Sequence, residues 1–122
     1  MFRTVLEEIL AKVPGALSVA LMGVDGIPIE EARVPADRQA GLNVDLIAAE
    51  YAALQKRIAK TNQGLDLTEV REFQIVTDRL AVLLNMVSAE YFLLLLMDRA
   101  AGTGRARYEL HRAQLRLEAE LV

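Results

Sequence analysis

Three strand-like apolar runs follow one another closely in the second half of the chain. They span 70–77, 80–87 and 91–97, and they are separated by Asp78-Arg79 and Ser88-Ala89-Glu90. Separators of two or three residues are too short for a crossover helix, so the three strands are predicted to form an antiparallel meander. The run 91–97 is wholly apolar, which predicts a central strand covered on both faces. The run 70–77 alternates only in part and carries Glu72 and Gln74, which predicts an outer strand.

A second pair of strands is predicted near the N-terminus. Residues 16–22 are almost all apolar, and a shorter apolar run at 27–29 follows across Asp25-Gly26. Asp-Gly between two such runs is a strong hairpin signal, because the tight turns favoured there need positive φ. Pro28 and the charges after it place the second strand of this hairpin nearer an edge of the sheet.

Helical periodicity appears in three segments, 2–13, 42–60 and 105–121. Pro14-Gly15 ends the first helix, and Asn62, Gly64 and Asp66 follow the second. The prediction is an α/β protein of the α+β type, with element order α-β-β-α-β-β-β-α. Its five-stranded antiparallel sheet carries one long helix on one face and two terminal helices on the other. We expect one domain over 1–122, because no repeat, low-complexity segment or long linker divides the chain.

Composition excludes several function classes. The 14 Lys and Arg against 17 Asp and Glu argue against nucleic acid as the main partner, since phosphate binding needs clustered positive charge. Without cysteine there is no disulfide, zinc ribbon or thiol nucleophile, and we expect no cofactor. The longest apolar stretch, 91–97, falls far short of the about 20 residues that span a bilayer. We therefore expect no membrane span, and with no secretory signal at the start we expect a cytoplasmic protein.

Reactive groups are scarce. Gly102-Thr103-Gly104 lacks the spacing and the lysine of a phosphate-binding loop. Adjacent carboxylates such as Glu7-Glu8 point apart and do not share one site. The single histidine, His111, is predicted to be a half-exposed packing residue of the last helix. In the same helix Arg105, Arg112 and Arg116 share a side with Glu109 and Glu120, which predicts a solvated face with local ion pairs.

The middle helix has two apolar sectors. Val44, Ile47, Tyr51, Leu54 and Ile58 form a bulky sector, and Ala48, Ala49, Ala52 and Ala53 form a small one on a different side. One sheet needs only one sector, so the small sector is predicted to be spare. Either a second helix approaches it, or alanine simply fills solvent positions as the best helix former.

Pairing of two copies through the outer strand would satisfy both the strand edge and the small sector. The predicted dimer interface comprises Ala48, Ala49, Ala52, Ala53, Val70, Glu72, Gln74 and Val76.

Three segments together resemble the roadblock / dynein light chain family, especially its bacterial MglB-like branch. They are VPGALSVALMGVDGIPIEE, NVDLIAAEYAALQKRI and EFQIVTDRLAVLLNMVSAEYFLLLLMD, in that order along the chain. The resemblance covers most of the sequence and includes no catalytic signature.

What the resemblance implies is a non-enzymatic regulatory or scaffolding homodimer that binds a small Ras-like GTPase, in a pathway of the gliding-motility and polarity type. Known bacterial members activate GTP hydrolysis by repositioning groups within the GTPase, without inserting an arginine. For this chain, scaffolding and GTPase activation both stay open. The implied GTPase surface is the middle helix around Glu50, Lys56 and Arg57.

Two other functions are kept as alternatives. A small-molecule sensor would need convergent polar groups, for which the strands and turns offer only Ser18, Gln74, Asn85 and Ser88. An enzyme would rely on Asp25, Glu90 or His111.

Overall fold

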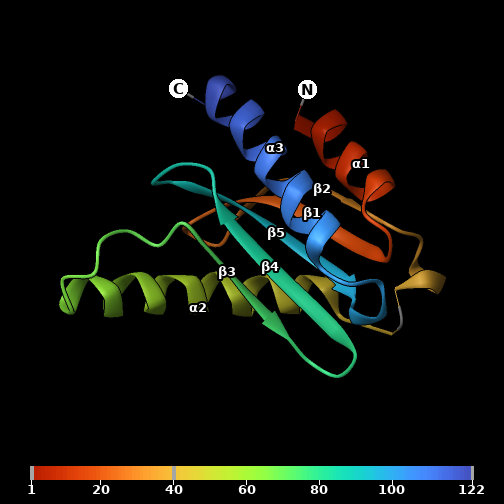
Figure 1. The fold of residues 1–122 in the computed structure, drawn as a ribbon, viewed down its shortest axis with the longest axis horizontal. Helices are drawn as coiled ribbons and strands as arrows, with labels where there is room; N and C mark the ends of the chain where they lie inside the picture. The colour runs from red at the N-terminus through yellow and green to blue at the C-terminus, as the bar shows by residue number, and fades with distance from the viewer. Residues whose placement is uncertain (1, 40, 122) are drawn as a thin grey trace.

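A five-stranded antiparallel sheet runs through the computed structural model, which describes residues 2–39 and 41–121 (Figure 1). Its strands are β1 (Ala16–Gly23), β2 (Pro28–Arg33), β3 (Glu72–Val76), β4 (Leu80–Met86) and β5 (Tyr91–Asp98), arranged in the order β2-β1-β5-β4-β3. The predicted meander is confirmed. Strand β5, which contains the wholly apolar run 91–97, is central, and β2 and β3 form the two edges.

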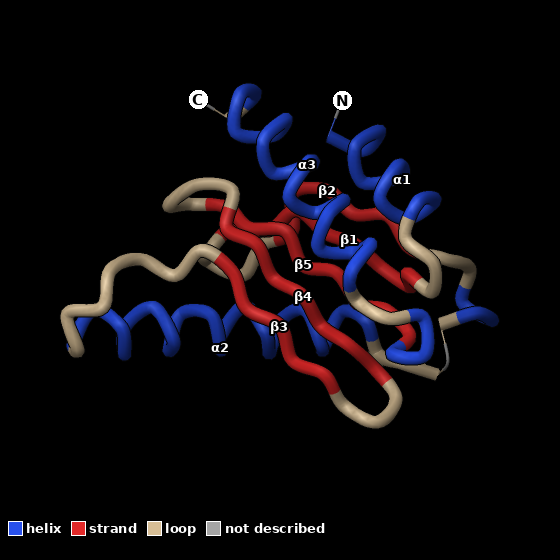
Figure 2. The backbone as a smooth tube through the Cα atoms, in the orientation of Figure 1, coloured by secondary structure: helices blue, strands red, loops and turns tan. Residues whose placement is uncertain are grey.

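Helices cover both faces of this sheet. The helices α1 (Phe2–Lys12) and α3 (Gly104–Glu120) lie together on one face, and α2 (Val44–Gly64) lies on the other (Figure 1). Two short 3-10 helices, η1 (Ala36–Arg38) and η2 (Arg99–Ala101), connect these elements, as Figure 2 shows in the helix colour. The predicted fold class and element order are confirmed.

The sheet separates two apolar cores. Beneath α1 and α3 the first core includes Leu6, Leu95 and Leu117, and beneath α2 the second includes Leu94 and Phe92. Successive side chains of a strand point to opposite faces, so β5 supplies side chains to both cores. Burial of each such side chain is worth about 1.5–3 kcal/mol, which explains why the strand whose residues 92–97 are all apolar occupies the centre.

The first hairpin turns where Asp25-Gly26 predicts it. Gly26 has φ +90°, and the Asp25 carboxylate accepts a hydrogen bond from the Ile27 amide at 3.1 Å. Strand β2 runs to Arg33, so it includes the charged residues that were predicted to lie on it, and these residues pair with β1. Charge on an edge strand is compatible with pairing, since one of its faces stays partly open to water.

Two element boundaries also differ from the prediction. Asn43 caps α2 by accepting a hydrogen bond from the Leu46 amide at 3.1 Å, and the helix runs on to Gly64 rather than ending at residue 60. Asp66, at φ +57°, then turns the chain back toward the sheet. Strand β3 begins at Glu72 instead of residue 70, because the paired register with β4 starts at Glu72–Asn85 and Arg71 adds only one hydrogen bond within the described residues, from the Met86 amide.

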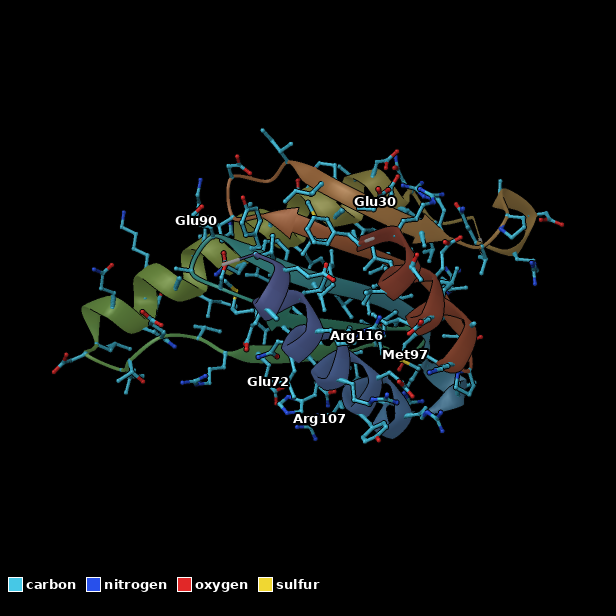
Figure 3. All side chains as sticks on the ribbon, turned by 90° about the horizontal axis from the view of Figure 1, so that it is seen from above. Glu30, Glu72, Glu90, Met97, Arg107 and Arg116 are labelled. Atoms are coloured by element: carbon cyan, nitrogen blue, oxygen red, sulfur yellow. The ribbon has the colours of Figure 1, made fainter. Side chains whose placement is uncertain are left out.

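The prediction of a solvated charged face on α3 is wrong for Glu109. Only 5% of its side chain is exposed, because Arg105 and Arg112 fold over it at 3.0 and 3.7 Å. Arg116 reaches across to Glu8 of α1 at 2.7 Å, and Figure 3 places it between the two helices. His111 is exposed on the surface of α3.

Candidate interaction surface

Strand β3 leaves one edge of the sheet open. It pairs with β4 on one side only, and along it exposed and half-buried residues alternate. Phe73 and Ile75 are half-buried, and Phe73 packs against the core beneath α2. On the opposite face Glu72 accepts hydrogen bonds from Arg107 of α3 at 3.0 Å and from Asn85 at 3.4 Å (Figure 3). An open edge of this kind offers unpaired main-chain groups to another strand.

The other edge strand, β2, carries features that discourage pairing. Pro28 has no amide donor, and the ladder with β1 shifts register between Leu21 and Met22. Arg33 contacts Asp45 at 2.8 Å and Glu31 at 2.7 Å, and the hydrogen bonds to these two carboxylates raise the pKa of Arg33. The β3 edge has no proline and a regular ladder, so it is the better edge for association.

Contacts fix how α2 is rotated over the sheet. Asp45 bonds to Arg33 of β2, and a Cβ placed on Gly26, in the turn between β1 and β2, would lie 3.9 Å from the Ala52 Cβ. The flank of α2 that carries Asp45 and Ala52 therefore faces β2. By the helical period of 3.6 residues, Leu54 lies roughly half a turn around the helix from Asp45, so its flank faces β3.

The flank of α2 on the β3 side consists of Ile47, Leu54 and Ile58, and we call it the β3-side flank. All three are half-buried. Ile47 packs against the core, whereas Leu54 and Ile58 belong to neither core cluster, nor does Ile75 of the neighbouring strand. Half-buried apolar side chains outside the core have surface left for a partner. The bulk of this sector was visible in the sequence, but its position beside the open edge was not.

The small sector does not form the spare surface that was predicted. Ala52 is only 3% exposed and lies within the core beneath α2, and Ala48 packs against that core. Both face the sheet, because a small side chain at position 52 lets the helix pass close to Gly26. Only Ala49 and Ala53 of this sector are exposed. The prediction that the four alanines share one side away from the sheet is therefore wrong.

The remaining predicted surface residues lie where a partner can reach them. Val70 is half-buried, and Glu72, Gln74 and Val76 are exposed along β3, with Val76 at 48%. Glu50, Lys56 and Arg57 are exposed on α2, and none of these three forms an ion pair within the described residues. By the helical period, Glu50 and Arg57 project away from the sheet and Lys56 projects toward the β2 side.

The four polar residues considered for a sensor are not brought together. Ser18 shares the α2 face of the sheet with Ala20, while Asn85 bonds to Gln114 of α3 on the other face at 3.3 Å. Gln74 is exposed on the edge strand. Of the four, only Ser88 borders a groove of about 790 Å³ between α2 and residues 66–71.

The residues considered for an enzyme are all on the surface. Asp25 and Glu90 lie in neighbouring turns, since the Val24 amide donates to the Glu90 carbonyl at 2.9 Å, and His111 lies on α3. Within the described ranges no cluster of three or more His, Asp or Glu side chains is placed to hold a metal ion. No helix in that part of the chain is both long and apolar enough to cross a bilayer.

Comparisons with known proteins add a relationship to this geometry. No family model and no curated protein matches the chain. Among solved structures, MglC from Myxococcus xanthus is 30% identical, with a TM-score of 0.69 and 98% of each chain covered. The gliding protein MglB from Thermus thermophilus is 19% identical, with a TM-score of 0.83 over 97% of this chain and 86% of that one. A Roadblock/LC7 domain from Streptomyces avermitilis is 18% identical, with a TM-score of 0.82 over 98% and 96%.

The two more distant structures show a shared fold. The MglC match combines higher identity with almost complete coverage of both chains, and it agrees with the three sequence segments that carry the resemblance. The chain therefore belongs to the roadblock/LC7 family, in the bacterial branch of MglB and MglC.

Proposed function

We propose that the chain is a non-enzymatic regulatory or scaffolding subunit that forms a homodimer and binds a small Ras-like GTPase. The observation that carries the proposal is the open β3 edge beside apolar side chains of α2 that lie outside the core. One related MglB structure has a tetrameric arrangement, so self-association occurs among relatives of this fold. The gliding protein from T. thermophilus supports a role in gliding motility or cell polarity.

Two-fold symmetry determines the geometry of the proposed dimer. Antiparallel pairing of two β3 strands would extend the sheet across both copies and bring the two β3-side flanks toward each other. Val70, Glu72, Gln74 and Val76 stay in the proposed interface. The β3-side flank replaces the four alanines, because Ala48 and Ala52 face the sheet and Ala49 and Ala53 lie away from the β3 edge.

The GTPase surface would then be the outer ridge of the paired α2 helices. On this ridge Leu46 is 56% exposed, and Glu50 and Arg57 carry charges without partners in the described part of the chain. Exposed charges of both signs around an apolar side chain set the orientation of a partner and the rate at which it associates. Two copies place two such ridges side by side, which makes one continuous docking face.

Nucleotide-dependent binding tests this proposal. Purified candidate GTPases encoded by neighbouring genes, loaded with GDP or with a non-hydrolysable GTP analogue, are titrated against the chain. We expect one loaded state to bind, and the double change Glu50→Lys with Arg57→Glu to weaken that binding about tenfold or more, because close charge pairs carry much of such coupling. The matched control is Glu7→Lys on α1, which should bind normally.

No binding in either nucleotide state would contradict the proposal, and so would equal loss in the control variant. A hydrolysis assay on the same complexes distinguishes GTPase activation from scaffolding alone.

A further inference from the structure

The C-terminal half of α2 projects beyond the strands at one end of the sheet (Figure 1). A groove lies at this end of the molecule. The C-terminal half of α2 forms one wall, and residues 66–71 form another. The turn between β4 and β5 and two residues of α3, Gln114 and Glu118, complete it. Its volume of about 790 Å³ is within the range typical of ligand sites.

Gln55 places an amide oxygen without a hydrogen-bond donor among the described residues beside this groove. Its side chain is 5% exposed, and its Nε2 donates only to the Met86 sulfur at 3.6 Å, which is a weak acceptor. Its Oε1 accepts no hydrogen bond within the described residues. No fully enclosed side-chain N or O atom there lacks a partner, so this oxygen must be open to the groove that Gln55 lines. Buried amides normally have their hydrogen bonds made, and this one has capacity left for a ligand.

A stretch of main chain that lines the groove with Gln55 also lacks hydrogen bonds to the rest of the described chain. The segment 68–70 is held at both ends, because the Leu67 amide donates to the Asn62 carbonyl and the Met86 amide donates to the Arg71 carbonyl, each at 2.8 Å. Between these anchors Thr68, Glu69 and Val70 make no main-chain hydrogen bond within the described ranges. Three consecutive residues with free amide and carbonyl groups can pair with an extended peptide.

Charge identifies the kind of peptide. The groove is lined by Asp66, Glu69 and Glu118 against a single cation, Arg71. Asp66 and Glu69 have no ion-pair partner among the described residues. Glu118 accepts a hydrogen bond at 3.1 Å from the uncharged amide of Gln114 and forms no ion pair there. Unpaired carboxylates around a partly enclosed site attract cationic side chains.

We propose that this groove binds an extended basic segment of a partner protein. The peptide main chain pairs with residues 68–70 and with the Gln55 amide, and its Lys or Arg side chains reach Asp66 and Glu69. The site is built from one copy of the chain and lies apart from the outer ridge of α2. It therefore does not depend on the GTPase. Val70 also belongs to the proposed dimer interface, so a bound peptide and a second copy compete for that residue.

The test uses the full chain and two pools of fluorescein-labelled peptides, each about eight residues long, so that the extended peptides exceed the length of the segment. One pool carries Lys at alternate positions and the other carries Glu there. In fluorescence anisotropy we expect the Lys pool to bind about tenfold more tightly than the Glu pool or better. The double change Asp66→Asn with Glu69→Gln should weaken binding of the Lys pool about fivefold to tenfold, because it removes two partly exposed ion pairs.

Further variants connect the result to the groove. Gln55→Met keeps the size of the side chain and removes its amide, and we expect it to weaken Lys-pool binding about threefold or more. Glu50→Gln, on the outer ridge, is the matched control and should leave peptide binding unchanged. Amide NMR shifts on addition of the Lys pool should centre on residues 68–70. Circular dichroism checks that each variant is folded.

Three outcomes would overturn the proposal. One is no binding of the Lys pool at about 1 mM, the weak end of specific recognition. Another is equal affinity in the wild type and the Asp66/Glu69 double variant. The third is displacement of the peptides by an equal concentration of spermidine, which would mean a simple cation site.

Discussion

Leu54 offers a sharp test of which side of α2 meets a second copy. It lies on the β3-side flank, half-buried and outside both core clusters, while its neighbour Ala53 is exposed and points away from the sheet. The substitutions Leu54→Asp and Ala53→Asp add the same charge to the same turn of the helix. Ala and Leu are both strong helix formers, so the two changes have similar helix-propensity costs, and a large difference between them reports the surroundings of each side chain.

The expected effect follows from burial. At most about a third of the Leu54 surface is exposed, so about 0.5–1 kcal/mol of its 1.5–3 kcal/mol of burial energy is still to be gained. Two-fold symmetry doubles this gain, so loss of both Leu54 side chains removes about 1–2 kcal/mol from dimer formation. This corresponds to a rise in the dimer Kd of about 5- to 30-fold. Burial of the introduced carboxylate raises the Kd further. Ala53→Asp should change the Kd less than about fivefold.

Sedimentation equilibrium over a range of concentrations measures the dimer Kd of each variant and of the wild type. Thermal melts followed by circular dichroism check that the variants are folded. The reasoning is refuted if Ala53→Asp dissociates the dimer as strongly as Leu54→Asp does. It also fails if the wild type is monomeric at about 100 μM, well above the Kd of a specific dimer.

Two further predictions concern stability. Arg116 donates a hydrogen bond to Glu8 and lowers the pKa of Glu8, so the folded form holds the proton less tightly than the unfolded form. The contribution of this pair to the unfolding free energy should be complete above the unfolded pKa of Glu8 and lost as the pH falls through its folded pKa. In urea titrations at several pH values, the unfolding free energy of Glu8→Gln should therefore depend less on pH over this range than that of the wild type. Gly15 has φ +79° and an added Cβ would lie 2.9 Å from the Ala101 Cβ, whereas Gly41 has φ +72° and no atom within 4 Å of the added Cβ. Gly41→Ala should therefore cost about 1 kcal/mol of unfolding free energy and Gly15→Ala about 2–3 kcal/mol, and equal costs in urea titrations would contradict the clash.

Local rules were sufficient for the architecture. Apolar runs with separators of two or three residues allow only hairpin connections, which is why the meander, the central β5 and the Asp25-Gly26 turn were predictable. Their outcome depends on residues close together in the chain. The element ends were less accurate, because α2 runs to Gly64 and the start of β3 depends on where β4 offers a partner.

Long-range packing decided the site. Both sectors of α2 are apolar, so periodicity alone does not say which one meets the sheet. Burial of Ala52 in the core beneath α2 sets that rotation, and the ion pair of Asp45 with Arg33 shows which flank faces β2. The same applies to Glu109, whose burial arises from two arginines and a neighbouring helix. In the sequence, Gln55 has the pattern of an ordinary polar helix residue. Only the folded structure shows that it lies beside Met86 and lines the same groove as segment 68–70. Chain-local patterns therefore determine the elements and their order, whereas the rotation of a helix and the grouping of distant polar atoms are set by contacts that exist only after folding.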